Sequence, residues 1–152
     1  MKILHLADLH LGKRVNEISM IEDQKYILDQ IITLIKEENV GIVLLCGDIY
    51  DKSIPTIEAI HLLDDFLDEL SKMGTKVLMI SGNHDSIDRL SFGKSLFTRS
   101  NLYIASQFED EIEKVTVKEN EMTVNFYMLP FVKPAYINHI FQLQTESYEE
   151  CF

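Results

Sequence analysis

The sequence has no tryptophan, only three prolines and six glycines, and only two cysteines among its 152 residues. Because 46% of the residues are hydrophobic and Gly and Pro are scarce, the collagen-like, low-complexity and disordered classes are excluded. A chain of about 150 residues buries roughly 70% of its unfolded surface, which suffices for one hydrophobic core. We therefore expect residues 1–152 to form a single domain.

The two cysteines are far apart, with Cys46 in an apolar run and Cys151 near the end of the sequence. They form neither a close-spaced disulfide framework nor a Cys-x-x-Cys motif, which favours a reducing compartment. No stretch approaches the roughly 18 apolar residues of a membrane span. Asp8 also comes too early for the apolar core of a signal peptide. We therefore expect a cytoplasmic protein with no membrane partner.

Positive charge is scarce as well, because 14 Lys and Arg oppose 25 Asp and Glu, for a net charge of -11. Binding of nucleic acid over a whole surface normally requires a basic face, so the composition disfavours that mode. A nucleic-acid enzyme remains compatible with this charge. Bound divalent cations, or a partner outside this chain, can supply the positive charge that such an enzyme needs.

Short apolar runs rich in Val, Ile and Leu predict three buried strands, at 2–7, 41–46 and 75–80. Apolar residues at three- and four-residue spacing predict helices between these strands, over about 20–38 and 56–73. Strands that alternate with helices imply right-handed crossovers and a parallel sheet. The expected fold class is therefore α/β, with a parallel βαβαβ unit at the N-terminus.

The pattern changes after this unit. A weaker helical pattern covers about 87–97, and two Val- and Thr-containing runs at 112–118 and 122–129 predict an antiparallel hairpin. The mixed polar and aromatic stretch after Pro134 is compatible with one more helix.

A polar cluster follows each of the three predicted parallel strands. The carboxyl ends of parallel strands face one crevice, which is where open α/β sheets bind ligands. Any one cluster alone is equally compatible with an ordinary turn, but their coincidence at three strand ends favours a shared site. The clusters are Asp8-Leu9-His10, Gly47-Asp48-Ile49-Tyr50-Asp51 and Gly82-Asn83-His84-Asp85.

The residue types in these clusters predict a metal site. Asp8 and His10 are two residues apart, so in an extended chain they project to the same side and can reach one ion. Asp48 has two carboxylate oxygens, which can bridge two cations about 3.5 to 4 Å apart. Asn83 adds a carbonyl oxygen. Oxygen and nitrogen ligands without thiolate favour Mn²⁺, Mg²⁺, Fe or Zn²⁺ over copper, so we assign Asp8, His10, Asp48 and Asn83 as metal ligands.

His84 receives a different role, because neighbouring side chains in a tight turn diverge and Asn83 and His84 then cannot serve one ion. A histidine beside metals can donate a proton to a leaving alkoxide, so we assign His84 as the catalytic general acid. Asp51 and Asp85 are placed next to the metals or the substrate. An alternative for Asp51 is that it caps the helix that begins near Pro55.

The three clusters resemble the pattern of the calcineurin-like metallophosphoesterases, D-x-H, G-D-x-x-D and G-N-H-D. The segments 1–12, 47–55, 82–93 and 129–131 narrow the resemblance to the SbcD-type nucleases of that family. The resemblance implies a β-sandwich flanked by helices in αββα layers, of which this chain holds a part. It also implies two Mn²⁺ ions bridged by Asp48, and an in-line attack on phosphorus.

The activity implied by the resemblance is DNA phosphodiester cleavage. SbcD-type enzymes act as exonucleases on duplex ends and as endonucleases on single strands and hairpins, in DNA repair, recombination and replication. The implied partners are DNA, an SbcC-type ATPase and a second copy of the chain, which would bind through helices of the nuclease domain.

One departure from the family pattern affects the metal site. The family completes the site with histidines in later G-H and G-H-x-H motifs, whereas the only histidine after His84 is His139, which follows Asn138. We therefore expect an N-terminal part of a nuclease domain, without the DNA-binding cap and the partner-binding regions. Two cations would normally compensate the charge of the clustered carboxylates. Because the later ligands are missing, we expect this chain to bind Mn²⁺ weakly, one ion rather than two, and to cut DNA poorly.

Two alternatives stay open. The chain resembles small-molecule phosphatases and cyclic-nucleotide phosphodiesterases of the same superfamily in its metal residues, which contact phosphorus and not the leaving group. The second alternative is a non-catalytic fragment that serves dimerisation or partner binding. The helices predicted at 20–38 and 56–73 would then supply the surface.

Overall fold

The computed structural model describes residues 1–142, 144, 147 and 149. At its centre is a four-stranded sheet in the order β1-β4-β5-β6, in which every neighbouring pair is parallel. The register aligns the last residue of each strand with the last residue of its neighbour, so the four strands end at one level. The strands are β1 (Ile3–Ala7), β4 (Ile42–Cys46), β5 (Lys76–Ile80) and β6 (Leu102–Ala105).

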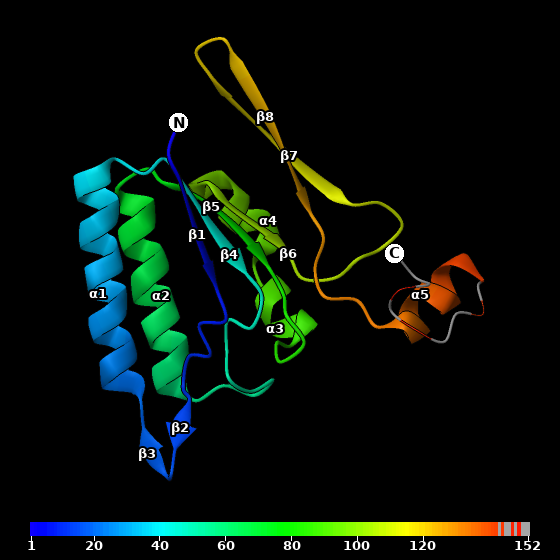
Figure 1. The fold of residues 1–152 in the computed structure, drawn as a ribbon, viewed down its shortest axis with the longest axis horizontal. Coiled ribbons are helices and arrows are strands. Elements are labelled where there is room, and N and C mark those ends of the chain that lie inside the picture. Colours follow the sequence, from blue (N-terminus) through cyan, green and yellow to red (C-terminus); the bar gives the residue numbers. More distant parts are fainter. Residues whose placement is uncertain (143, 145–146, 148, 150–152) are drawn as a thin grey trace.

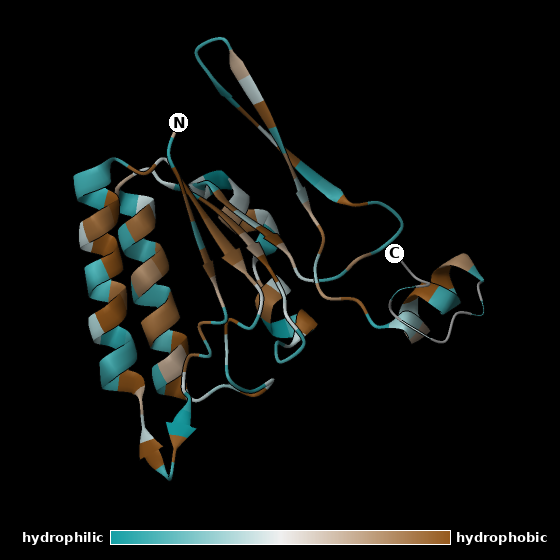
Figure 2. Cartoon of the chain, viewed as in Figure 1, coloured by the Kyte–Doolittle hydropathy of each residue, from teal (hydrophilic) through white to brown (hydrophobic). Residues whose placement is uncertain are grey.

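Two long helices, α1 (Ile21–Glu38) and α2 (Ile57–Lys72), lie side by side and cover one face of the sheet (Figure 1). Both helices mix apolar and polar residues along their length (Figure 2), and their buried residues form an apolar stripe. The apolar stripes and the sheet enclose the main core, which includes Leu28, Val43 and Phe66. A small hairpin, β2 (Arg14–Val15) and β3 (Ile18–Ser19), connects β1 to α1. This arrangement confirms the predicted α/β class and the βαβαβ unit.

The other face of the sheet is covered in part. An antiparallel hairpin of β7 (Glu113–Glu119) and β8 (Met122–Met128) packs Val117 and Met128 against the face formed by β4, β5 and β6. On β1 the residues that point to this face, among them Ile3 and His5, are exposed within the described chain. A last helix, α5 (Pro134–Phe141), lies beyond the sheet edge (Figure 1).

One strand was missed in the sequence analysis, and one predicted helix needs correction. Strand β6 was not predicted from the sequence, because its apolar run is only four residues long and follows a helical pattern. The helix predicted over 87–97 is interrupted at Gly93, whose φ of +76° is left-handed and incompatible with a continuous α-helix. The segment instead forms α3 (Ile87–Ser91), α4 (Lys94–Phe97) and a 3-10 turn, η1 (Thr98–Ser100).

Among the helices of the described residues, none combines the length and the apolar character needed to cross a membrane.

Candidate metal centre

The loops that follow β1 and β4 continue side by side beyond the sheet. The backbone N–H of Asp8 donates to the carbonyl of Gly47 over 3.2 Å, and that of His10 donates to the carbonyl of Asp48 over 2.9 Å. The two predicted clusters therefore meet because the parallel pairing extends past the last strand residues. Leu11 forms an isolated parallel bridge with Tyr50, which fixes the far end of this contact.

Three of the predicted ligands have a left-handed backbone. The φ angles are +56° at Asp8, +44° at His10 and +46° at Asp48. A non-glycine residue in this region costs on the order of 1–3 kcal/mol and persists only where the surroundings enforce it. The other positive φ angles of non-glycine residues in the described chain occur at hairpin turns and helix ends, namely Asn16, Glu17, Asn39, Asn101, Asn120 and Gln142. At the strand ends, by contrast, the left-handed backbone directs the side chains of Asp8, His10 and Asp48 towards one another.

Two glycines let the loops after β4 and β5 cross closely. A Cβ on Gly82 would lie 2.1 Å from Oδ1 of Asp48 and 2.3 Å from its backbone nitrogen. A Cβ on Gly47 would lie 3.2 Å from Cα of Gly82. Only glycine fits at position 82, and the close approach presses the 82–85 loop against the Asp48 carboxylate.

Asp8, His10 and Asp48 each offer a ligand atom, and these atoms all lie within 4.8 Å of one another. His10 Nε2 is 3.9 Å from Asp8 Oδ1 and 3.8 Å from Asp48 Oδ2. Two ligand atoms that are each about 2.1 Å from one ion can be at most about 4.2 Å apart. The spacing from the imidazole to each carboxylate therefore suits a shared cation and is too long for a direct hydrogen bond.

The imidazole of His10 supports the same assignment. Its Nδ1 is buried without a hydrogen-bond partner and lies 3.6 Å from Asp51 Oδ1. Histidines that ligate a metal through one ring nitrogen usually direct the other at a carboxylate, which orients the ring. Asp51 stands in that position behind His10, at the side opposite Asp8 and Asp48. The alternative role of Asp51 as a helix cap is wrong, because α2 is capped by Thr56, whose Oγ1 accepts from the N–H of Ala59 over 3.3 Å.

The electrostatics of the centre favour a cation. Asp8, Asp48 and Asp51 bring three carboxylates together, and His10 is the only basic side chain within ion-pair distance of them in the described part of the chain. Asp48 is the most enclosed, with a side chain only 10% exposed, whereas that of Asp8 is 70% exposed. A divalent cation would offset the mutual repulsion of these groups. The donor set thus fits a hard or borderline metal ion.

His84 lies over the same centre. Its backbone N–H donates to Asp48 Oδ1 over 3.0 Å, and its ring centroid is 5.0 Å from that of His10. Its Nδ1 contacts the backbone carbonyl of Asp51 at 2.9 Å. A carbonyl only accepts, so Nδ1 carries a hydrogen and Nε2 is left for a substrate. This hydrogen bond is the main cause that raises the pKa of His84 above its ordinary value, and the carboxylates of Asp48, Asp51 and Asp85 raise it further.

Asn83 precedes His84 and is exposed. It borders two hollows. The first, with a volume of about 530 Å³, is also lined by Lys52, Ser53, Ile54 and His84. The second has a volume of about 260 Å³ and extends towards α5. Asn83 therefore shares a hollow with His84, whose backbone N–H contacts Asp48, and its role as a metal ligand stays a prediction.

Asp85 has a role that was not foreseen from the sequence. Its carboxylate accepts hydrogen bonds from the backbone N–H groups of Ile49, Tyr50 and Gly82, over 3.1, 3.0 and 2.9 Å. Both carboxylate oxygens are thereby occupied by the loops after β4 and β5. Asp85 thereby joins the two loops that carry Asp48 and His84, and its predicted place next to metal or substrate stays a prediction.

Gln24 belongs to the site but was not predicted from the sequence. Its side-chain nitrogen donates to the carbonyls of Leu9 and His10 over 3.1 and 2.7 Å, and its oxygen accepts from the N–H of Gly12 over 2.9 Å. The amide thus holds the loop that carries Asp8 and His10. A signal existed in the sequence, because Gln24 is a polar residue on the helical stripe that continues through Leu28 and Ile32.

Two other candidates for chemistry are inert. Burial raises the pKa of the Cys46 thiol, and burial, with the charges of Asp85 and Asp64, raises the pKa of Tyr50 to about 12. Neither group is an anion at neutral pH.

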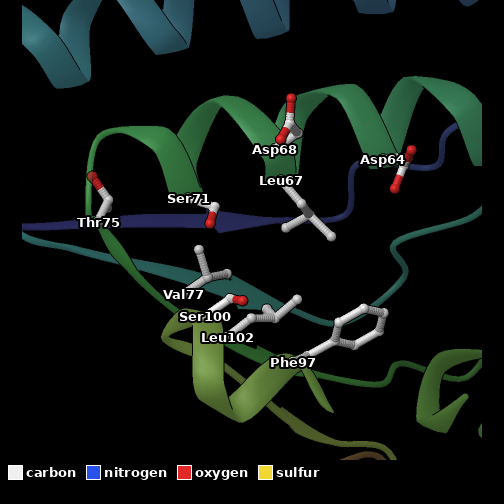
Figure 3. A pocket seen from close by; sticks show the side chains of 9 residues that line it. All are labelled: Asp64, Leu67, Asp68, Ser71, Thr75, Val77, Phe97, Ser100 and Leu102. Carbon is white, nitrogen blue, oxygen red and sulfur yellow. The ribbon is translucent and has the colours of Figure 1, made fainter. Parts of the chain in front are cut away.

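A separate hollow of about 190 Å³ lies between α2 and the α4–η1 segment, where Leu67, Val77 and Phe97 line it (Figure 3). It contains none of the predicted site residues.

Comparison with known proteins agrees with this geometry. Residues 1–147 match the family model described as calcineurin-like phosphoesterase. A curated relative from Staphylococcus saprophyticus, named as the SbcD subunit of the nuclease SbcCD, is 42% identical to this chain over 132 residues. The match covers 86% of this chain and 34% of that relative, so the chain spans about a third of the relative's length. With its strand-end residues and four-stranded parallel sheet in place, the chain belongs to the calcineurin-like phosphoesterase family.

Proposed function

We propose that this chain forms the metal-binding part of a phosphodiesterase that cuts DNA. One observation carries the proposal, namely the convergence of Asp8, His10 and Asp48 within 4.8 Å, with His84 held against Asp48. The similarity to a nuclease subunit supports DNA as the substrate. The -11 net charge of the chain requires that cations or a partner compensate the phosphate charge.

The residues would divide between the two cations that the family uses, and we expect this chain to hold the first of them; Mn²⁺ is our first choice. Asp8, His10 and Asp48 would hold the first. Asp48 would bridge to the second, and Asn83 would contribute to the second from the adjoining loop. Asp51 would orient His10 through Nδ1. When bound, such cations neutralise charge on the phosphoryl oxygens and make water a stronger nucleophile at neutral pH.

His84 would act as the general acid. Its Nδ1–H is committed to the carbonyl of Asp51, and so the ring can present protonated Nε2 to a leaving oxygen. The hydrogen bond to the Asp51 carbonyl, and after it the nearby carboxylates, raise the pKa of His84 above its ordinary value. The hollow in front of His84 is lined by Lys52, Ser53 and Asn83, and the ammonium of Lys52 would attract a phosphate that enters it.

Partners follow from the same proposal. The curated relative is named as a part of SbcCD, and we infer an SbcC-type ATPase as the partner. We also propose a homodimer formed through the helices. Several large apolar side chains on α1 and α2 are exposed, which supports such a surface; they are Tyr26, Ile27, Leu34, Ile57 and Ile60. Light scattering after size exclusion should give twice the mass of the 17.6 kDa chain.

Cleavage of end-labelled linear duplex and single-stranded DNA in Mn²⁺ tests the proposed function. We expect slow cleavage that EDTA abolishes, and a chromogenic phosphomonoester that stays intact. His84→Gln should retain Mn²⁺ binding and lower the cleavage rate by about 10²- to 10⁴-fold. Preferred hydrolysis of the phosphomonoester would instead identify a small-molecule phosphatase, the second candidate, because the metal residues are compatible with either substrate. Equal cleavage by wild-type and His84→Gln would remove His84 from the mechanism.

A further inference from the structure

A second cavity lies beside the metal centre, on the side of the 82–85 loop that faces α5. Its volume is about 260 Å³, and Asn83 and Asp85 belong to its lining. The aromatic side chains of Phe108, Phe131 and Tyr136 supply much of the remaining wall. Asn83 therefore borders both this aromatic-lined cavity and the hollow that is lined by His84.

The cavity has a fixed frame. Phe131 N–H donates to the carbonyl of Ser81 over 2.9 Å, and Ser81 Oγ donates to the carbonyl of Ser106 over 2.7 Å. These bonds join the segment after β8 to the ends of β5 and β6. On the far wall, the side-chain nitrogen of Gln107 donates to the hydroxyl of Tyr136. Phe108 and Val132, which line the cavity, form a small buried cluster with Ile137.

We propose that this cavity binds one unpaired nucleobase of the DNA, next to the phosphate that is cleaved. This inference rests on the proposed function and adds a substrate-binding element to it. Its volume is just below the roughly 300–1,000 Å³ of sites for drug-sized ligands, which leaves room for one ring system and excludes a base pair. An enzyme that takes one base from a duplex must act at a melted end or on a single strand.

The lining matches the chemistry of a base. The faces of bases stack on aromatic side chains, and this stacking depends little on sequence. Phe131 is 36% exposed, so a ring can reach it. The amides of Asn83 and Gln107 also line the cavity, and they can exchange hydrogen bonds with the donors and acceptors of a base. Lys133 also lines the cavity and would pair with a backbone phosphate.

Fluorescence of 2-aminopurine deoxyriboside 5′-monophosphate tests the proposal without any catalysis. The chain has no tryptophan, so the probe can be excited selectively, and stacking on an aromatic ring quenches it. The titration is performed in EDTA. We expect saturable quenching that dAMP reverses, whereas deoxyribose 5-phosphate, which has no base, competes at least tenfold less well.

Substitutions test whether the probe binds in this cavity. Phe131→Ala should weaken binding by about 5- to 100-fold, the range expected for the loss of one stacked base. Phe131→Leu keeps an apolar side chain and guards against a loss of fold, yet should also weaken binding because it has no aromatic face. Phe97→Ala removes a similarly exposed aromatic residue from α4, outside this cavity, and should leave binding unchanged.

Two results would overturn the proposal: equal competition by dAMP and deoxyribose 5-phosphate, or quenching that is unchanged in both Phe131 variants. Mn²⁺-dependent hydrolysis of bis(p-nitrophenyl) phosphate separates this proposal from the proposed function. If the ester is cleaved and the probe is not quenched, the base cavity is wrong and the phosphodiesterase stands. If the probe is quenched and neither the ester nor DNA is cleaved, the cavity stands and the proposed function fails.

Discussion

The strand-end loops and the β7–β8 hairpin are attached to the same sheet in different ways. The loops are joined by directional hydrogen bonds, above all those of Asp85 and Gln24. The hairpin is attached through apolar side chains such as Val117 and Met128, with ion pairs to the chain start and to Lys94 at its exposed edges. Apolar packing tolerates exchange at similar volume, whereas hydrogen bonds fix positions of individual atoms.

This difference teaches which part of the molecule the metal centre needs. The parallel sheet, α1 and the close-packed loops determine where Asp8, His10 and Asp48 lie. The β7–β8 hairpin contributes to stability, and the segment after β8 contributes to the cavity beside the site. Changes in the loops should therefore alter metal binding far more than changes of similar size in the hairpin.

Gly82→Ala should have the largest effect. The new Cβ would lie 2.1 Å from Asp48 Oδ1, and the loops after β4 and β5 would have to separate. We expect Mn²⁺ binding to be lost and the free energy of unfolding to fall by about 3 kcal/mol. Gly41→Ala is the matched control, because its Cβ would meet nothing closer than 4.0 Å. Calorimetric titration and urea unfolding measure both quantities, and equal behaviour of the two variants would contradict the close-packed arrangement.

Asp85→Ala should come next. It leaves the N–H groups of Ile49, Tyr50 and Gly82 without their acceptor, at a cost of about 2 kcal/mol in unfolding free energy. We expect Mn²⁺ affinity to fall by about 100-fold, since Asp48 lies next to Ile49 and Gly82, whose N–H groups would lose their acceptor. Asp88→Ala removes an exposed carboxylate from α3 and should change stability by less than about 0.5 kcal/mol. An Asp85→Ala protein with normal affinity would show that the loops do not need this link.

Gln24→Ala should have a smaller effect on the same centre. The loop that carries His10 would lose three hydrogen bonds, and we expect about tenfold weaker Mn²⁺ binding with about 1 kcal/mol lower stability. Gln30→Ala, at an exposed position of the same helix, controls for the change in helix propensity. If both variants bind Mn²⁺ equally, Gln24 has no positioning role.

Met128→Ala should affect the metal centre least. It empties a buried position between the hairpin and the sheet, and cavity formation should cost about 2 kcal/mol or more in stability. Mn²⁺ affinity of the folded variant should stay within twofold of the wild type. A large loss of affinity would contradict the proposed difference between the two regions and show that the hairpin also shapes the site.

The sequence predicted the parts of the fold that depend on simple periodicity. The strands at β1, β4 and β5 and the helices α1 and α2 lie within two residues of their predicted bounds, because their apolar runs are long or regular. It also predicted which residues meet, since parallel strands place their carboxyl ends together. Asp8, His10 and Asp48 converge for that reason.

The sequence did not predict features that depend on contacts between distant segments. Strand β6 is too short to have a recognisable period. The hydrogen bonds of Gln24 and Asp85 need the three-dimensional arrangement of loops before their partners exist. The position of Asp51 behind His10 depends on how the loop after β4 turns. The residue type alone does not decide between a helix cap and a site residue.

The most direct test of the central claim is calorimetric titration of Mn²⁺ into the wild-type chain and into Asp48→Asn. We expect saturable binding of Mn²⁺ by the wild type. Asp48→Asn should bind at least tenfold more weakly, because a neutral amide replaces the charged carboxylate that faces the cation. Asp65→Asn, at an exposed position on α2, should bind as the wild type does. Absence of saturable binding by the wild type, or equal affinity in Asp48→Asn, would contradict a metal centre at these strand ends.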